Sequence, residues 1–301
     1  MINGIMNIYK EAGFTSHDVV AKLRGIVKQK KIGHTGTLDP DAVGVLPVCF
    51  GNATKLCDLM TDKTKEYEAL MRLGVTTDTQ DMSGRILTQH EVHAGEAEAE
   101  AAIMHFVGGY EQIPPMYSAL KVNGKKLYEL AREGREVERQ PRHVDISFIR
   151  IVDIALPEVR FVVGCSKGTY IRTLCADIGE RLGCGAAMAA LKRTRVGGFR
   201  IEDAIPLSKV EELAAAGELE HYLTAPDSIF MEYEGASVKP EAESALLNGN
   251  KLYIRQLDFD NNTFFKDGEM LRVYNGKGEF QAVYAFVKNE GAFKPYKMFL
   301  G

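Results

Sequence analysis

Apolar and polar residues alternate with two different periods in the first part of the chain. The segment 15–30 has apolar residues at helical spacing and opens with Thr15 and Asp18, which form a capping-box pattern. The segment 66–73 alternates between apolar and polar residues, as a half-buried strand does. The pattern therefore predicts a helix that runs to about Lys30 and a strand further along.

Further helices and another strand follow from the same two periods. A short apolar run at 159–163 predicts the strand. Helical spacing and end signals predict three helices, namely 96–107 stopped by Gly108 and Gly109, 169–182 closed by Gly183, and about 208–216 opened by a capping box of Ser208 and Glu211. Interleaved helices and strands indicate a mixed α and β domain with a central sheet and flanking helices.

The stretch from Pro114 to Arg142 has poor periodicity and begins with two prolines. Loops of this length inside a compact domain are usually functional or disordered. We expect a long surface loop that contains some helix.

The pattern of apolar and polar residues changes after about residue 230. Short apolar runs at 251–254, 270–273 and 279–287 are separated by the turn signals Asn248-Gly249, Asp267-Gly268 and Asn275-Gly276. This pattern predicts a small all-β module. We place the boundary between residues 232 and 233, so that 1–232 form one domain and 233–301 the second.

Composition assigns the chain to the soluble globular proteins. Its 301 residues are 45% hydrophobic and 26% charged, and no apolar run approaches the ~20 residues of a membrane helix. The N-terminus lacks the features of a signal peptide. The five cysteines are widely spaced without a CxxC motif, which fits reduced thiols. We expect a cytoplasmic protein without a metal site or a membrane association.

The formal net charge of −4 argues weakly against nucleic-acid binding, but the cations are clustered. One basic run contains Lys22, Arg24, Lys28, Lys30 and Lys31, and a second, diluted by glutamates, extends from Lys121 through Lys125, Lys126, Arg132, Arg135 and Arg139 to Arg142. A solvated helix face would explain either run alone.

The segment from Gly33 to Gly44 surrounds His34, Asp39 and Asp41 with glycines. No Gly-Lys-Ser/Thr follows, which excludes a Walker phosphate loop. Apolar residues stand where a calcium loop needs oxygen ligands, and His34 with one carboxylate is too few ligands for zinc. An Asx turn at Leu38-Asp39-Pro40 explains the spacing as well as a catalytic carboxylate does, so the residues alone leave this site open.

Five blocks of sequence in a fixed order resemble the TruB family, the tRNA pseudouridine-55 synthases. They extend over about residues 3–200, which makes a chance match very improbable. The blocks are KIGHTGTLDPDAVGVLPVCFGNATKL at about 31–56, KEYEA with the following RLG and TDT at 65–79 and Asp81, PPMYSALK with the following Gly124, Leu127-Tyr128 and Ala131-Arg132, SKGTYIR at 166–172, and LKRT at 191–194 with Gly197 and Phe199.

One feature departs from the family pattern. The opening block usually has Lys-Pro, whereas this chain has Lys10-Glu11 before Ala12-Gly13-Phe14-Thr15-Ser16. Loss of the proline relaxes the φ angle of one loop and touches no chemical group of the site, so we expect only a local effect on stability. The last 65 or so residues resemble the family's RNA-binding PUA-like module in general pattern only.

The resemblance implies the fold and the partner. We expect an α+β pseudouridine synthase fold, with a large, mostly antiparallel central sheet flanked by helices and a small C-terminal all-β PUA-like module. The segment 114–142 would be a thumb-like loop. The implied partner is the T-arm of tRNA, and the protein is expected to be a monomer without an obligate protein partner.

The resemblance also implies the chemistry. Conversion of the T-loop uridine at tRNA position 55 to pseudouridine breaks the N1–C1′ bond and rejoins the uracil through C5, without redox change, so we expect no cofactor. A nucleophilic carboxylate suffices for this, and the resemblance assigns it to Asp39. Arg172, on the first turn of a helix that starts at about Thr169, would form a buried pair with Asp39 and keep it ionised.

Other residues would form the pocket for a uridine swung out of the RNA. By resemblance, Tyr67 packs on the base and takes the C5 or sugar proton, Tyr170 and Leu191 line the same pocket, and His34 stacks into the gap that the base leaves. Taken singly, these residues could equally be core or loop residues. The phosphates would be held by exposed cations, namely Lys22, Lys28, Lys30, Lys31, Lys121, Arg132 and Arg142.

Three other functions stay open. The first is the guide-RNA-dependent relative of box H/ACA particles, although the short chain without basic tails favours a stand-alone enzyme. The second is a tRNA-binding chaperone without catalysis, which the intact Asp39 block disfavours as the only role. The third, a glycosidase or phosphate-binding enzyme, lacks its motifs.

Overall fold

The computed structural model describes residues 2–122, 124–259 and 264–300. Its largest element is a nine-stranded sheet with the strand order β1-β3-β12-β4-β11-β10-β7, in which β2 also pairs with β3 and β13 with β12. The strands are β1 (Gly4–Lys10), β2 (Ile32–His34), β3 (Val43–Phe50), β4 (Lys65–Leu73), β7 (Gly108–Gln112), β10 (Arg142–Ala155), β11 (Glu158–Cys165), β12 (Ala186–Val196) and β13 (Phe199–Arg200). β3 and β12 run parallel, and the other pairs are antiparallel.

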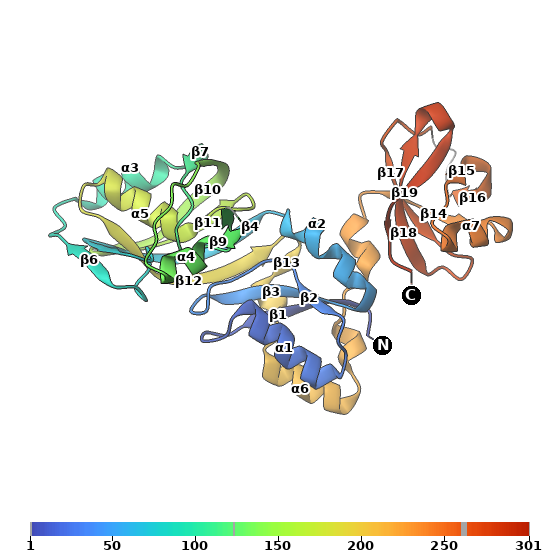
Figure 1. Cartoon of the computed structure of the whole chain (residues 1–301), viewed down its shortest axis with the longest axis horizontal. Coiled ribbons are helices and arrows are strands. Elements are labelled where there is room, and N and C mark those ends of the chain that lie inside the picture. The colour runs from blue at the N-terminus through green and yellow to red at the C-terminus, as the bar shows by residue number, and fades with distance from the viewer. Residues whose placement is uncertain (1, 123, 260–263, 301) are drawn as a thin grey trace.

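Two groups of helices cover this sheet (Figure 1). α1 (Ser16–Val27) and α6 (Leu207–Ala216) share a core cluster with β1 and β3. α3 (Glu96–Met104) and α5 (Ile171–Arg181) share a second cluster with β4, β11 and β12. The α+β fold with a mostly antiparallel sheet and flanking helices is therefore confirmed.

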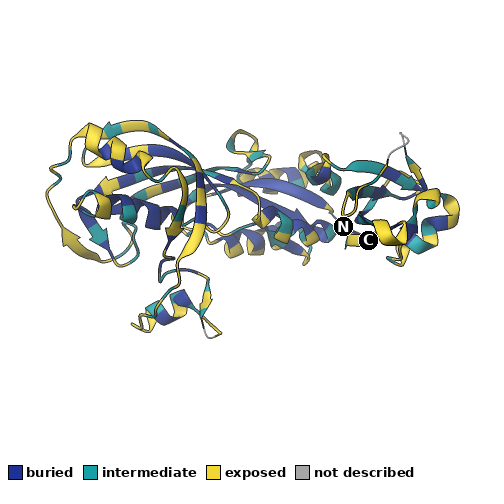
Figure 2. Ribbon diagram, turned by 90° about the horizontal axis from the view of Figure 1, so that it is seen from above, coloured by how far each residue is buried: buried dark blue, intermediate teal, exposed yellow. Residues whose placement is uncertain are grey.

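Two small hairpins extend from the large sheet. The first pairs β5 (Val75–Thr77) with β6 (Ile86–Gln89). The second pairs β8 (Lys121–Val122) with β9 (Lys125–Lys126) and leads into α4 (Leu127–Arg132). This second hairpin and α4 lie inside the predicted thumb-like segment and stand off from the sheet as a separate lobe (Figure 2).

The C-terminal residues form a six-stranded sheet beside the large one (Figure 1). Its order is β15 (Leu252–Tyr253), β19 (Ala292–Met298), β18 (Phe280–Val287), β17 (Met270–Tyr274), β14 (Glu234–Val238) and β16 (Leu257–Phe259). The short α-helix α7 (Glu243–Leu247) accompanies the strands of this β module. A shared cluster joins it to the large domain through Met60, Phe230, Val283 and Phe299.

Several predicted helix bounds are wrong. α1 ends at Val27 because Lys28 adopts a left-handed conformation with φ 52°. α3 ends at Met104, and α5 begins at Ile171 because Tyr170 before it is extended. Ser208 does not cap α6, which already begins at Leu207 after an extended proline.

Candidate active site

Asp39 lies in the loop that joins β2 to β3. The neighbouring Leu38 N–H donates a 2.9 Å hydrogen bond to the hydroxyl oxygen of Ser16 at the start of α1. The Gly13 N–H, in the turn before α1, donates a 3.0 Å bond to the Pro40 carbonyl. Backbone groups on both sides of Asp39 are therefore tied to the segment that begins α1.

Lys10, at the end of β1, is hydrogen-bonded to the same loop. Its fully buried ammonium donates hydrogen bonds to the carbonyls of Glu11, Pro40 and Ala42 at 3.0, 2.9 and 2.6 Å. Burial lowers the pKa of Lys10 to about 8, although the nearby Asp39 carboxylate acts in the opposite direction. Lys10 thus fixes the backbone after Asp39 and adds positive charge near it.

Arg193 on β12 holds the first half of the loop. Its guanidinium donates from Nε to the Val45 carbonyl at 2.7 Å, from Nη1 to the Thr37 carbonyl at 3.3 Å, and from Nη2 to the Gly36 carbonyl at 3.4 Å. Only 1% of Arg193 is exposed. One buried side chain therefore links β12 to β3 and to the residues before Asp39.

Gly44 allows β3 to approach β12 at this point. It faces Arg193 in the parallel pairing of the two strands, with φ +109°. A Cβ atom on residue 44 would lie 2.2 Å from the Arg193 carbonyl oxygen, a distance that only a glycine avoids. Gly44 therefore allows the close packing of β3 and β12 that places Arg193 against the loop.

Arg172, on the first turn of α5, contacts the Asp39 carboxylate. The distances are 3.0 Å from Nε to Oδ2 and 3.4 Å from Nη2 to Oδ1. Further bonds run from Nη1 to the Thr79 carbonyl at 3.1 Å and from Nη2 to the Tyr117 carbonyl at 2.9 Å. Nη1 also lies 3.5 Å from Oδ2 of Asp81, a second carboxylate. The guanidinium is thus fixed in place by four groups from three segments.

The Asp39 carboxylate is itself accessible. Its side chain is 41% exposed, whereas the side chain of Arg172 is only 7% exposed, so the pair is less buried than predicted. The surrounding protein raises the pKa of Asp39 through desolvation, and Arg172 opposes this only in part. A carboxylate that is partly desolvated, firmly positioned and open on one side is suited to nucleophilic attack.

Tyr67 and Leu191 lie beside this loop on neighbouring strands. Both are 9% exposed and belong to the same core cluster as Leu38. Tyr67 on β4 is the register partner of Arg193 on β12. Burial raises the pKa of the Tyr67 phenol, and the charge of Arg193 acts to lower it. The structure therefore places these two predicted pocket residues in the core cluster that also contains Leu38, the residue before Asp39.

Tyr170 immediately precedes α5, two residues before Arg172. Its N–H donates a 2.8 Å bond to Gln112 Oε1, and the Gln112 amide donates a 3.1 Å bond to its carbonyl. Burial raises the pKa of the Tyr170 phenol. Ser118 and cations including Arg172 act to lower this pKa. The structure thus attaches Tyr170 to the end of β7 near Arg172.

His34 ends β2 at the start of the Asp39 loop. Its Nδ1 accepts a 3.3 Å hydrogen bond from the Gly36 N–H, and its ring meets that of His17 edge-on at 5.4 Å between centroids. Burial lowers the pKa of His34, and the nearby His17 and Arg193 add to this. A neutral, half-buried imidazole is suited to stacking contacts.

The seven cations predicted to hold phosphates are all exposed. Three of them, Lys28, Lys30 and Lys31, lie between α1 and β2, in the chain segment that leads to His34. Lys22 lies on α1, and the others, Lys121, Arg132 and Arg142, belong to or border the thumb-like segment.

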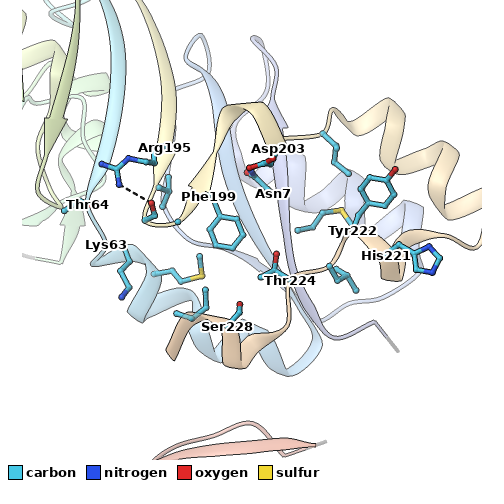
Figure 3. A pocket seen from close by; sticks show the side chains of 18 residues that line it. Asn7, Lys63, Thr64, Arg195, Phe199, Asp203, His221, Tyr222, Thr224 and Ser228 are labelled. Atoms are coloured by element: carbon cyan, nitrogen blue, oxygen red, sulfur yellow. Dashed lines mark hydrogen bonds between the residues drawn. The ribbon is translucent and has the colours of Figure 1, made fainter. Parts of the chain in front are cut away.

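A separate cavity of about 670 Å³ lies elsewhere on the large domain (Figure 3). Its lining includes Asn7, Lys63, Arg195 and Phe199, and none of the predicted site residues. Across the described residues, no group of three or more His, Cys, Asp or Glu side chains could hold a metal ion. No helix in the described ranges has the length and apolarity to cross a membrane.

Comparisons with known proteins agree with this fold. The TruB family pseudouridylate synthase (N terminal domain) matches residues 24–171, and the tRNA pseudouridylate synthase B C-terminal domain matches residues 172–230. A chain from the structure of an H/ACA RNP bound to a substrate RNA containing 2′-deoxyuridine is similar, with a TM-score of 0.73 and 26% identity over 99% of this chain and 85% of that one. A chain of a Cbf5-Nop10-Gar1 complex matches equally well at 28% identity. The protein is therefore a pseudouridine synthase, an isomerase that acts on RNA.

The sequence relatives define the family. The chain is 49% identical to the tRNA pseudouridine synthase B of Lachnoclostridium phytofermentans, over 99% of this chain and 100% of that protein. It is 50% identical to the enzyme of the same name from Alkaliphilus oremlandii, over 85% of both. The chain belongs to the TruB family.

Proposed function

We propose that this enzyme converts the T-loop uridine at position 55 of tRNA to pseudouridine, with the Asp39 carboxylate as nucleophile. The observation that carries the proposal is the exposed Asp39 carboxylate, held by Arg172 in a loop that Ser16, Lys10 and Arg193 fix. The tRNA substrate is supported by the names of relatives that match the whole chain.

The isomerisation needs few chemical groups. Substrate and product contain the same atoms: the N1–C1′ bond breaks, a C5–C1′ bond forms, C5 loses a proton and N1 gains one. Asp39 attacks and holds the glycosyl or uracil fragment while the base rotates. Tyr67, shielded from water and within the electrostatic influence of Asp39, receives the proton from carbon.

The base reaches Asp39 only outside its stack. Tyr67, Tyr170 and Leu191 would line the pocket for the extruded uracil, and His34 would occupy the space it leaves in the RNA. The exposed cations between α1 and β2 and along the thumb-like segment would contact phosphates, which position the RNA without reading its sequence.

The experiment uses the full chain and an unmodified tRNA transcript, without guide RNA or another protein. We expect pseudouridine at the T-loop uridine, mapped by chemical modification and primer extension. Absence of product at that position would refute the substrate assignment. Product only in the presence of a guide RNA would instead favour the H/ACA-like alternative, for which the structural likeness is the supporting observation.

The nucleophile is tested by Asp39→Asn beside the matched control Asp41→Asn, an exposed carboxylate two residues away in the same loop. Asp39→Asn should bind the transcript as tightly as the wild type and form no product, whereas Asp41→Asn should stay active. Full activity in Asp39→Asn would overturn the mechanism. Accelerated tRNA folding by Asp39→Asn would indicate a chaperone function separate from catalysis.

A further inference from the structure

Arg193 is a buried cation whose charge is solvated by backbone carbonyls. It is the largest of the fully buried side chains, and its hydrogen bonds go to three neutral carbonyls. Within the described ranges, no carboxylate lies within ion-pair distance of its guanidinium. A buried charge that is solvated only by carbonyls strongly favours a negative charge that develops beside it.

The side chain beside the Arg193 guanidinium is the phenol of Tyr67. Tyr67 and Arg193 face each other across the antiparallel pair of β4 and β12, with both side chains buried. Directly opposed side chains of this kind approach within contact distance. The other charged or titratable groups that act on this pair are Cys165 from β11, Asp39 from the loop, Lys65 from β4 itself, Lys10 from β1 and His34 from β2.

The chemistry requires a base at this position. The proton on uracil C5 must leave after the C5–C1′ bond has formed, and N1 gains a proton from solvent. When the Tyr67 phenolate takes the C5 proton it becomes a neutral phenol, and it returns its proton to water before the next turnover. Burial alone makes a phenolate costly, so this cycle needs a nearby cation.

We propose that Arg193 is the positioning residue that stabilises the Tyr67 phenolate and, through Gly36 and Thr37, sets its place relative to Asp39. The same guanidinium holds the loop of the nucleophile and faces the base, so one side chain fixes the geometry of both. This inference rests on the assignment of Tyr67 as proton acceptor in the proposed function.

The test measures single-turnover rates against pH for Arg193→Gln and Arg193→Lys. Arg193→Gln should slow pseudouridine formation at pH 7 by about 10²-fold and move the rising limb of the pH profile to higher pH, because the phenolate loses its cation. Arg193→Lys keeps the charge and should return the limb towards the wild-type pH. Arg195→Gln, on the same strand and beside Glu66, is the matched control and should keep the wild-type profile.

A purely structural role predicts a different result. Both Arg193 variants would then lose activity to the same extent, with the wild-type pH dependence, and this outcome would overturn the proposal. A second measurement replaces Tyr67 by 3,5-difluorotyrosine, whose phenol is more acidic. In Arg193→Gln it should move the rising limb back to lower pH, and an unchanged limb contradicts the inference.

Folding of Arg193→Gln is checked by its melting temperature. If that variant does not fold, the ionisation of Tyr67 is followed by NMR with ¹³Cζ-labelled tyrosine in the wild type and in Arg193→Lys. Equal titration of Tyr67 in both is expected because both keep a cation beside the phenol, and a Tyr67 that titrates at clearly higher pH in Arg193→Lys would overturn the proposal. Full activity of Tyr67→Phe refutes the proton-acceptor assignment itself. Any converted uridine serves as readout, so failure of the T-loop assignment leaves this test intact.

Discussion

At the scale of single residues, the directions of the guanidinium donors decide what Arg172 can do. Nε and Nη2 face Asp39, while Nη1 and Nη2 also reach the carbonyls of Thr79 and Tyr117. Because these acceptors come from separate segments, the planar fork defines the position of the carboxylate. A lysine ammonium is a single point of charge and cannot satisfy this set.

Arg172→Lys should therefore lower the rate although the charge is retained. We expect a loss of about 10²-fold in the single-turnover rate constant, because the Asp39 carboxylate is no longer held in one orientation. Arg181→Lys, at the exposed end of the same helix, is the control. Equal rates for Arg172→Lys and the wild type would show that charge alone is sufficient.

The pKa of Asp39 gives a prediction for stability. Burial raises this pKa above that of the unfolded chain, so the folded state favours the protonated carboxyl. The associated stability is fully present below the unfolded pKa and is lost as pH rises through the folded pKa. Asp39→Asn is neutral throughout this range. The melting temperature of Asp39→Asn minus that of the wild type should therefore increase from pH 4 to pH 7. A difference that stays constant over this range, or shrinks, would contradict the assigned shift.

The sequence allowed some of these residues to be predicted and hid others. Asp39 and Arg172 were paired through their motifs, and the structure places them in contact across 133 positions of sequence. Lys10 and Arg193 were not assigned a role in the site. Their partners are backbone carbonyls of distant segments, which leave no trace in side-chain type or spacing. Their complete burial is the signal, and only the fold reveals it.

At the scale of elements, the start of α1 serves both a helix and the active-site loop. The Thr15 hydroxyl caps the helix by accepting from the Asp18 N–H at 3.1 Å, and the capping box is complete, as predicted. The next residue, Ser16, accepts from Leu38 in the loop instead. The two adjacent hydroxyls therefore have different roles: Thr15 stabilises the helix, and Ser16 positions the loop.

Substitution of these two hydroxyls should have different consequences. Thr15→Ala should reduce the free energy of unfolding by about 1 kcal/mol and leave the rate of pseudouridine formation unchanged. Ser16→Ala leaves the buried Leu38 N–H without an acceptor, which costs about 1–3 kcal/mol, and should also lower the rate. Urea unfolding and single-turnover kinetics measure both. An unaltered rate in Ser16→Ala would show that the loop holds its shape without this bond.

Alternation made β4 easier to predict than β3, which is buried almost throughout. β4 alternates in burial along its length, and its pattern predicted it nearly to the residue. β3 is buried at every position from Gly44 to Phe50, so no period of two remains, and it contains Pro47, which argues against a central strand. β1 and β12 were likewise not predicted, although they carry Lys10 and Arg193. The strands that fix the site are thus those whose pattern is least informative.

At the scale of the whole molecule, the two sheets are joined by an apolar cluster. Phe230, at the end of the short helical turn Pro226–Phe230, is 4% exposed and lies close to Tyr233, Phe280 and Phe299. The same cluster contains Met60 of the large domain. The boundary between residues 232 and 233 stays a prediction, but the two parts share part of their core.

This shared core predicts that the two parts unfold together. A single calorimetric transition is expected for the full chain, because separation would expose Phe230 and its aromatic neighbours to water. Phe230→Ala removes the ring at the centre of the junction, which should cost about 3–5 kcal/mol and resolve two transitions. Leu213→Ala, a core change on α6 in a different cluster, should lower the melting temperature without splitting the transition. Two transitions in the wild type would show that the module is a separate folding unit. One transition in Phe230→Ala would show that the two parts stay coupled without this ring.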